Sequence, residues 1–92
     1  MLPKISNYGE YSSSNYGAHS RRVELANITL FYSYDTIVAY TDGKDGLTVS
    51  TNQWGVTTGK HLNWIDGGDK KNRKTADQFT AMLTAACIRH NI

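Results

Sequence analysis

A chain of 92 residues is long enough for one domain, and folding would bury about two thirds of its unfolded surface. Ten Lys and Arg against eight Asp and Glu give too small a net charge to predict nucleic-acid binding from the overall field. The single cysteine, Cys87, excludes an internal disulfide and favours a reduced, cytoplasmic protein. The N-terminus lacks the apolar run of a signal peptide, and no stretch of about 18 apolar residues occurs, so neither secretion nor a membrane partner is expected.

The first part of the chain, residues 1–20, is polar and rich in tyrosine. The tetrapeptide Ser-Asn-Tyr-Gly occurs in it twice, at 6–9 and 14–17. Ser, Asn and Gly compete with regular backbone pairing, which favours a flexible arm. The alternative is an ordered loop that presents tyrosine rings and His19 to a ligand, since such rings lose little conformational entropy on ordering.

Residues 21–65 are predicted to form an antiparallel sheet, because apolar side chains alternate with polar ones or occupy both faces. The loop 42–46, Asp-Gly-Lys-Asp-Gly, is the clearest hairpin signal, since its two glycines permit a positive φ. The predicted strands are 21–25, 28–34, 36–41, 47–51 and an edge strand near 61–65.

The clearest helix signal follows a basic run at 70–74. Thr75 is a natural N-cap, and Gln78 three residues later completes a capping box. An apolar stripe at helical spacing follows, made of Phe79, Met82, Leu83, Ala86 and Cys87. The predicted class is therefore α+β, a small antiparallel sheet of about four or five strands with one C-terminal helix, 75–91, packed on one face of the single domain 1–92.

The stretch 52–65, NQWGVTTGKHLNWI, contains both tryptophans among hydroxyl, amide and basic side chains. A core strand would not normally hold so many groups that need hydrogen bonds, so we predict a binding surface. Gly59 and Lys60 invite comparison with a phosphate-binding loop, but the spacing from Gly55 is one residue short, and His61 stands where Ser or Thr would hold magnesium. The stretch is expected either to bind a phosphate without hydrolysing it or to be a solvated turn.

Catalytic and metal-binding patterns are not found in the sequence. The three histidines and the cysteine do not fall at zinc-site spacings, no serine lies in a nucleophile elbow, and the carboxylates are scattered among turns. We expect no enzymatic activity, metal or cofactor. The basic run 70–74, with Arg21, Arg22 and Lys60, could contact nucleic-acid phosphates while aromatic rings stack on bases, although such a run is more often a solvated loop.

Three segments together resemble a family of short uncharacterised domains encoded by bacteriophages, plasmids and related mobile elements. They are YSSSNYGAHS (11–20), FYSYDTIVAY (31–40) and NQWGVTTGKHLNWI (52–65). The family pattern couples a Tyr-x-Ser-x-Asn-Tyr-Gly-x-His segment to Asn-x-x-Trp and then Thr-Thr-Gly-Lys-His-Leu-Asn. The resemblance covers about 6–65 and implies a protein acting in the bacterial cytoplasm, with the two polar segments forming one site.

From this resemblance we expect a non-catalytic anti-defence protein that sequesters a phosphate-bearing signalling nucleotide. Arg22 and Lys60 would neutralise charge, while Trp54 or Tyr16 would stack on a base. A pocket between the subunits of a homo-oligomer would enclose such a ligand better than one small protomer. The predicted ligand-binding residues are Tyr16, His19, Arg22, Trp54, Thr57, Thr58, Lys60, His61 and Asn63.

Two other hypotheses stay open. The protein could be an inhibitor that covers a host defence protein complex or nucleic acid through the tyrosine-rich arm and the basic run, and its binding would then depend on salt. It could also be a structural module without a role in defence.

Overall fold

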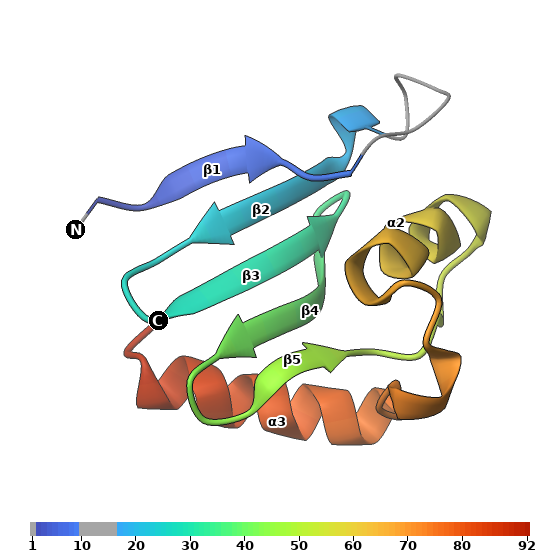
Figure 1. Cartoon of the computed structure of the whole chain (residues 1–92). Coiled ribbons are helices and arrows are strands. Elements are labelled where there is room, and N and C mark those ends of the chain that lie inside the picture. The colour runs from blue at the N-terminus through green and yellow to red at the C-terminus, as the bar shows by residue number, and fades with distance from the viewer. Residues whose placement is uncertain (1, 10–16) are drawn as a thin grey trace.

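The computed structural model describes residues 2–9 and 17–92, which form an antiparallel five-stranded sheet (Figure 1). Each strand pairs with the next along the chain, so the order in the sheet is β1-β2-β3-β4-β5. The strands are β1 (Lys4–Asn7), β2 (Ser20–Glu24), β3 (Ile28–Ser33), β4 (Thr36–Asp42) and β5 (Gly46–Val49). The predicted α+β class is confirmed.

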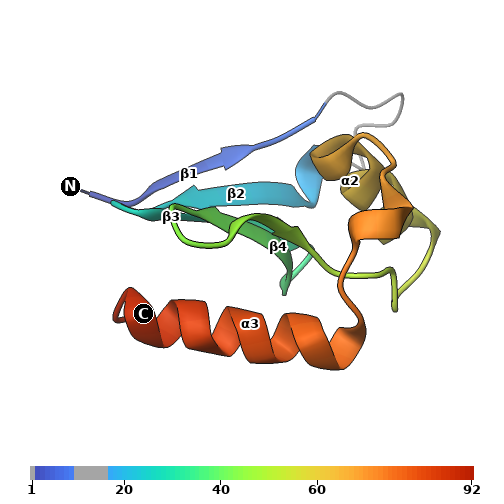
Figure 2. The same ribbon diagram turned by 60° about the horizontal axis from the view of Figure 1, so that its bottom comes forward.

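Two helices cover opposite faces of the sheet. The longer, α3 (Ala76–Arg89), runs along one face, and α2 (Val56–Asp66) lies on the other face at one end (Figure 2). A short 3-10 turn, η1 (Lys70–Asn72), lies between them in the chain. The sheet therefore has a hydrophobic core on each side, whereas the sequence predicted one helix on one face.

The interior strand β4 contributes residues to both cores and contains a β-bulge. Phe31 pairs with Ala39 and Tyr32 with Ile37, which leaves Val38 as the extra residue in the register. Val38 and Ala39 consequently both pack in the core beneath α2, while Ile37 belongs to the core beneath α3. The bulge thus explains how the neighbours Val38 and Ala39 pack in the same core, although successive residues of a regular strand point to opposite faces.

The core on the α3 side holds the C-terminal helix as its apolar stripe predicts. Phe79 and Ala86 are buried against sheet residues that include Ile28, Leu30 and Tyr40. The capping box is confirmed: Gln78 N donates to the Thr75 hydroxyl at 3.3 Å, and Thr75 N donates to Gln78 Oε1 at 3.2 Å.

The predicted edge strand near 61–65 is wrong, because these residues belong to α2. The residues that face the sheet are Thr58, His61, Leu62 and the half-buried Ile65, which recur at helical spacing. Because Thr58 and His61 are polar, a pattern that counts only apolar residues does not show the helical period. Gly67 ends the helix in the left-handed conformation, with φ 66°.

Part of the predicted N-terminal arm is a regular strand. β1 pairs with β2 in antiparallel register, with Ile5 opposite Val23. Tyr8, just after β1, is buried, and its hydroxyl donates to the backbone oxygen of Tyr32 at 2.8 Å. The middle of the arm, 10–16, lies outside the described residues.

Candidate functional site

A cavity of about 390 Å³ lies where the β3–β4 turn meets the start of α2. Its volume falls within the range of about 300 to 1,000 Å³ that small-molecule sites occupy. No Asp or Glu is among the described residues that line it, and hydroxyl groups and aromatic rings predominate. The lining residues are Ser33, Tyr34, Thr36, Trp54, Gly55, Val56, Thr57 and Thr58.

The first turn of α2 lines this cavity, and its backbone N–H groups lie outside the hydrogen-bond ladder of the helix. Its N-cap is Gly55, and no described side chain caps the turn or places an acidic group in it. The helical ladder starts with Gly59 N donating to Gly55 O at 2.9 Å, so the amides of Val56, Thr57 and Thr58 precede the first helical bond. Such a helix start carries partial positive charge and attracts anions.

The loop that leads into α2 is shaped by Asn52. Its Oδ1 accepts from Trp54 N at 2.9 Å, while its Nδ2 donates to Gly55 O at 3.0 Å. An Asn side chain that bonds its own backbone two residues on holds a tight turn. A side chain at Gly59 would place its Cβ 3.0 Å from Asn52 Nδ2, so a glycine there lets α2 pack close to the loop.

Two exposed aromatic side chains belong to the cavity wall. Trp54 is 42% exposed and Tyr34 is 41% exposed. Tyr34 occupies the β3–β4 turn with φ 57°, a conformation that is uncommon for a residue other than glycine. Its ring stacks on that of His19, with 4.3 Å between centroids and 19° between planes. The rings offer flat apolar surfaces beside the helix start.

A buried polar cluster forms the floor beside the cavity. Ser33 Oγ lies 2.7 Å from His61 Nδ1 and 2.9 Å from Thr58 Oγ1. Ser33 is 2% exposed and His61 is fully buried. A serine next to a histidine resembles a nucleophile and its base, but a buried hydroxyl held by two partners is poorly placed to attack a substrate. The cluster is better suited to fixing side-chain orientation than to catalysis.

The predicted ligand-binding residues divide between this cavity and its surroundings. Trp54, Thr57 and Thr58 line the cavity. His61 is hydrogen-bonded to the lining residue Ser33, and the ring of His19 stacks on the lining residue Tyr34. These five residues, from two distant parts of the sequence, therefore gather at one end of the sheet.

Three other predicted residues are not among those that line the cavity. Arg22, on β2, donates from Nε to Ser6 Oγ at 3.4 Å, and the exposed Lys60 is not a lining residue. Asn63 accepts from Arg73 Nη2 at 3.0 Å and lines a separate, more polar cavity of about 200 Å³. Tyr16 lies outside the described residues.

Ser33 and Tyr34 are contributors that the sequence reasoning missed. Ser33 carries a weak signal, since it is a polar residue at the end of an otherwise apolar and aromatic strand. Tyr34 carries no such signal in the sequence, because its positive φ is a property of the folded turn rather than of the residue type.

The basic run 70–74 is partly used inside the fold. Arg73 Nε forms an ion pair with Asp66 Oδ2 at 2.7 Å, and both side chains are largely buried. Burial alone would raise the pKa of Asp66, but the hydrogen bond from Arg73 and that from Gly68 N outweigh it and lower the pKa. Lys70 and Lys71 remain exposed on η1.

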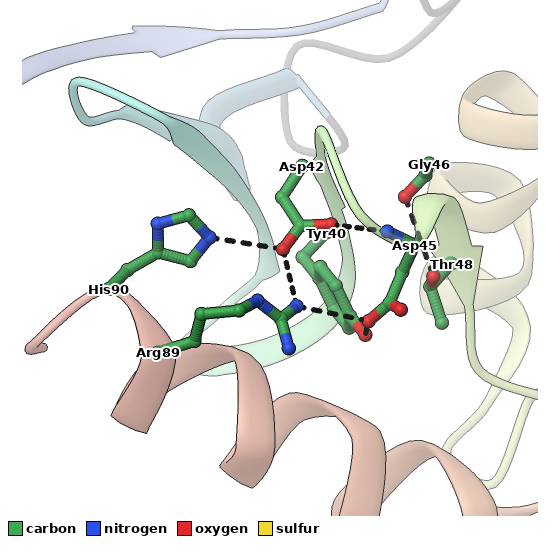
Figure 3. A network of polar contacts seen from close by, with 7 residues as sticks. All are labelled: Tyr40, Asp42, Asp45, Gly46, Thr48, Arg89 and His90. Atoms are coloured by element: carbon green, nitrogen blue, oxygen red, sulfur yellow. Dashed lines mark hydrogen bonds and ion pairs between the residues drawn. The ribbon is translucent and has the colours of Figure 1, made fainter.

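A second polar network, drawn in Figure 3, includes Asp42 at the end of β4, whereas Thr36 at the start of β4 lines the cavity. Arg89 Nη2 donates to Asp42 Oδ2 at 2.6 Å, and His90 Nε2 lies 3.0 Å from the same oxygen. The hydrogen bond from Arg89, assisted by that from Asp45 N, lowers the pKa of the buried Asp42. Burial, with the hydrogen bond to Asp45, raises the pKa of Tyr40 to about 12. This network joins the end of α3 to the β4–β5 hairpin.

The described residues form neither a metal-binding cluster nor a membrane-spanning helix. In the part of the chain that the structure describes, no group of three or more His, Cys, Asp or Glu side chains is arranged to hold a metal ion. None of the helices formed by residues 2–9 and 17–92 is long and apolar enough to cross a membrane.

Comparisons with known proteins identify the family. Neither the curated proteins nor the solved structures contain a match to the chain. A family profile does match, over residues 3–81, which include every strand, α2 and the cavity. The chain therefore belongs to DUF8033, a family of unknown function.

Proposed function

We propose that this protein binds a phosphate-bearing small molecule, a nucleotide, in the cavity at the start of α2 and holds it without chemical change. The observation that carries the proposal is the meeting of an uncapped helix start, hydroxyl groups and exposed aromatic rings around one cavity of about 390 Å³. Each of these components recognises a different part of a nucleotide.

The helix start and the hydroxyls suit the phosphate. Three backbone amides in the first turn of α2 precede the helical ladder, and the side chains of Thr57 and Thr58 add hydroxyl groups in the same turn. Backbone N–H groups and hydroxyls that donate to an anion form charge-assisted hydrogen bonds. The lack of a carboxylate among the described lining residues means that no charge of the same sign repels the phosphate there.

The aromatic rings suit a base. Trp54 and Tyr34 both line the cavity and are both partly exposed. Stacking of a base on an aromatic ring contributes about 1 to 3 kcal/mol to binding. Rings beside an anion site favour a nucleotide over free phosphate.

Absence of catalysis is supported by the state of the serine–histidine pair that the described residues form beside the cavity. Ser33 is almost fully buried and is hydrogen-bonded to both His61 and Thr58. The function of the protein would then be to retain the ligand rather than to convert it. Together with the resemblance to domains of mobile elements, this leads us to propose an anti-defence role in the bacterial cytoplasm, in which the protein sequesters a signalling nucleotide.

Isothermal titration with a panel of nucleotides, including cyclic AMP and cyclic dinucleotides, tests the proposal. Thr57→Val should weaken binding about tenfold through the lost hydroxyl donor, and Trp54→Ala should weaken it through lost stacking. The control is Thr84→Val, which makes the same change on the exposed side of α3. If no nucleotide binds, or if Thr57→Val and Thr84→Val bind equally well, the site assignment is wrong.

The anti-defence role needs a separate test. Expression of the wild type in a bacterium that signals with the bound nucleotide should lower the free nucleotide and protect an infecting phage, whereas Trp54→Ala should do neither. Protection by Trp54→Ala at the wild-type level would show that the role does not depend on this cavity.

The second candidate is binding of a host protein or nucleic acid through the basic run. The exposure of Lys70 and Lys71 on η1 favours it, while the ion pair of Arg73 with Asp66 reduces the free charge. Such binding should weaken steeply with salt and with Lys70→Gln and Lys71→Gln together.

A further inference from the structure

We infer that His61 and Ser33 are positioning residues that set the direction in which the Thr58 hydroxyl donates, so that protonation of His61 strengthens binding of an anion in the cavity. This inference rests on the proposed function, because it concerns how the same cavity holds its phosphate.

The geometry is a chain of three side chains from the floor to the cavity. His61 Nδ1 lies 2.7 Å from Ser33 Oγ, which lies 2.9 Å from Thr58 Oγ1. Ser33 and Thr58 line the cavity, whereas His61 is fully buried behind them. Each hydroxyl has one proton to donate, so when Ser33 donates to His61, the bond between Ser33 and Thr58 must use the Thr58 proton.

When His61 Nδ1 carries no proton, it accepts the proton of Ser33. Ser33 Oγ then accepts from Thr58, whose proton points inward and whose lone pairs face the cavity. An oxygen lone pair repels a phosphate oxygen. In this arrangement Thr58 therefore disfavours an anion.

When His61 Nδ1 carries a proton, the reversed set of bonds becomes available. His61 donates to Ser33, the Ser33 proton is free to go to Thr58 Oγ1, and the Thr58 proton is then released to donate to a ligand in the cavity. An imidazolium carries a proton on both ring nitrogens, so protonation removes the first arrangement, in which His61 accepts from Ser33. By linkage, an anion that accepts from Thr58 in turn favours the protonated form of His61.

Other titratable groups near His61 define the controls. The ring of Tyr8, after β1, lies 6.1 Å from that of His61, and the ring of Tyr34, in the β3–β4 turn, lies 6.3 Å from it. His19 stacks on the far side of the site against Tyr34, and Lys60 precedes His61 on α2. His19 is the second imidazole at the site and must be separated from His61 by mutation.

The test measures the affinity for cyclic AMP by isothermal titration at about pH 6 and about pH 8, which span the ordinary titration of histidine. The phosphodiester of cyclic AMP keeps one negative charge across this range, so only the protein changes. We expect wild-type affinity to be about tenfold higher at the lower pH, the gain typical of one hydrogen bond to a charged group. Ser33→Ala and Thr58→Val, which break the chain at different links, should each remove the difference.

The His19→Gln variant should keep the difference whatever its absolute affinity, because the chain from His61 through Ser33 to Thr58 is intact in it. A wild-type affinity that is equal at both pH values overturns the inference while leaving the proposed function standing. Retention of the difference in a folded Ser33→Ala or Thr58→Val variant also overturns it. Failure of the wild type to bind any nucleotide at either pH rejects the proposed function, and this inference with it.

Discussion

Leu62 packs α2 against the sheet. Its side chain is fully buried in the core with Phe31, Val38 and Val49. Leu62→Ala should lower the free energy of unfolding by about 2 to 5 kcal/mol, because it removes buried methyl groups and leaves a cavity. Urea denaturation followed by circular dichroism measures the change.

The matched control for that substitution is Leu47→Ala, since Leu47 is half exposed on β5. It should cost much less stability. Equal losses for the two variants would mean that α2 is not packed on the sheet as described.

Single residues also show where sequence reasoning fails. Thr58 and His61 read as surface groups because they are polar, yet both are buried and hydrogen-bonded through Ser33. A buried polar side chain is stable only when its partner is in place, and that partner lies on a strand far away in the sequence. The polar centre of 52–65 predicts a binding surface, but its helical form could not be predicted from it.

Among the elements, α3 depends most on local signals. Its N-cap Thr75 and the reciprocal bonds with Gln78 are present as the capping box predicts. Thr75→Ala should lower the free energy of unfolding by about 1 kcal/mol, because the first turn loses the side-chain acceptor. Thr80→Ala, at an exposed position inside the helix, should be neutral or slightly stabilising because alanine has the higher helix propensity. Thermal denaturation compares the two, and a loss in Thr80→Ala as large as that in Thr75→Ala would contradict the capping argument.

Elements that depend on distant partners were harder to predict. The capping box, the apolar stripe and the glycine hairpin are local, and α3 and the β4–β5 turn follow from them. β1 is only four residues long and mostly polar, and it is a strand because Ile5 pairs with Val23 across a long connection. The association of protomers into a homo-oligomer, which the small size of one protomer led us to expect, stays a prediction.

At the scale of the whole molecule, Thr36 at the start of β4 lines the cavity, whereas the Asp42 network lies at the end of that strand. The network joins the last turn of α3 to the β4–β5 hairpin, and Arg73 with Asp66 joins α2 to the segment before α3. The ion pairs of Asp42 with Arg89 and of Asp66 with Arg73 thus lie away from the cavity wall. Substitutions that change stability through either pair can therefore be separated from substitutions that change ligand binding.

Those two ion pairs predict a loss of stability in acid. The pKa values of Asp42 and Asp66 are lowered in the folded protein, whereas in the unfolded chain they return to the ordinary value of about 4. Above that pH both states are ionised and the stabilisation is complete. As the pH falls below about 4, the unfolded chain binds protons first, so the free energy of unfolding decreases until the folded carboxylates are protonated too.

Urea denaturation at several pH values between about 7 and 3 checks this prediction, with Asp42→Asn as the informative variant. At pH 7 it should be less stable by about 2 to 3 kcal/mol, because Arg89 and His90 lose a buried partner. Its stability should also fall less steeply in acid, since one of the two carboxylates no longer titrates. Asp35→Asn, an exposed position in the β3–β4 turn, should keep the wild-type acid slope. An unchanged slope in Asp42→Asn would show that this network does not govern the acid response, and the Asp66 ion pair would then be the group to mutate.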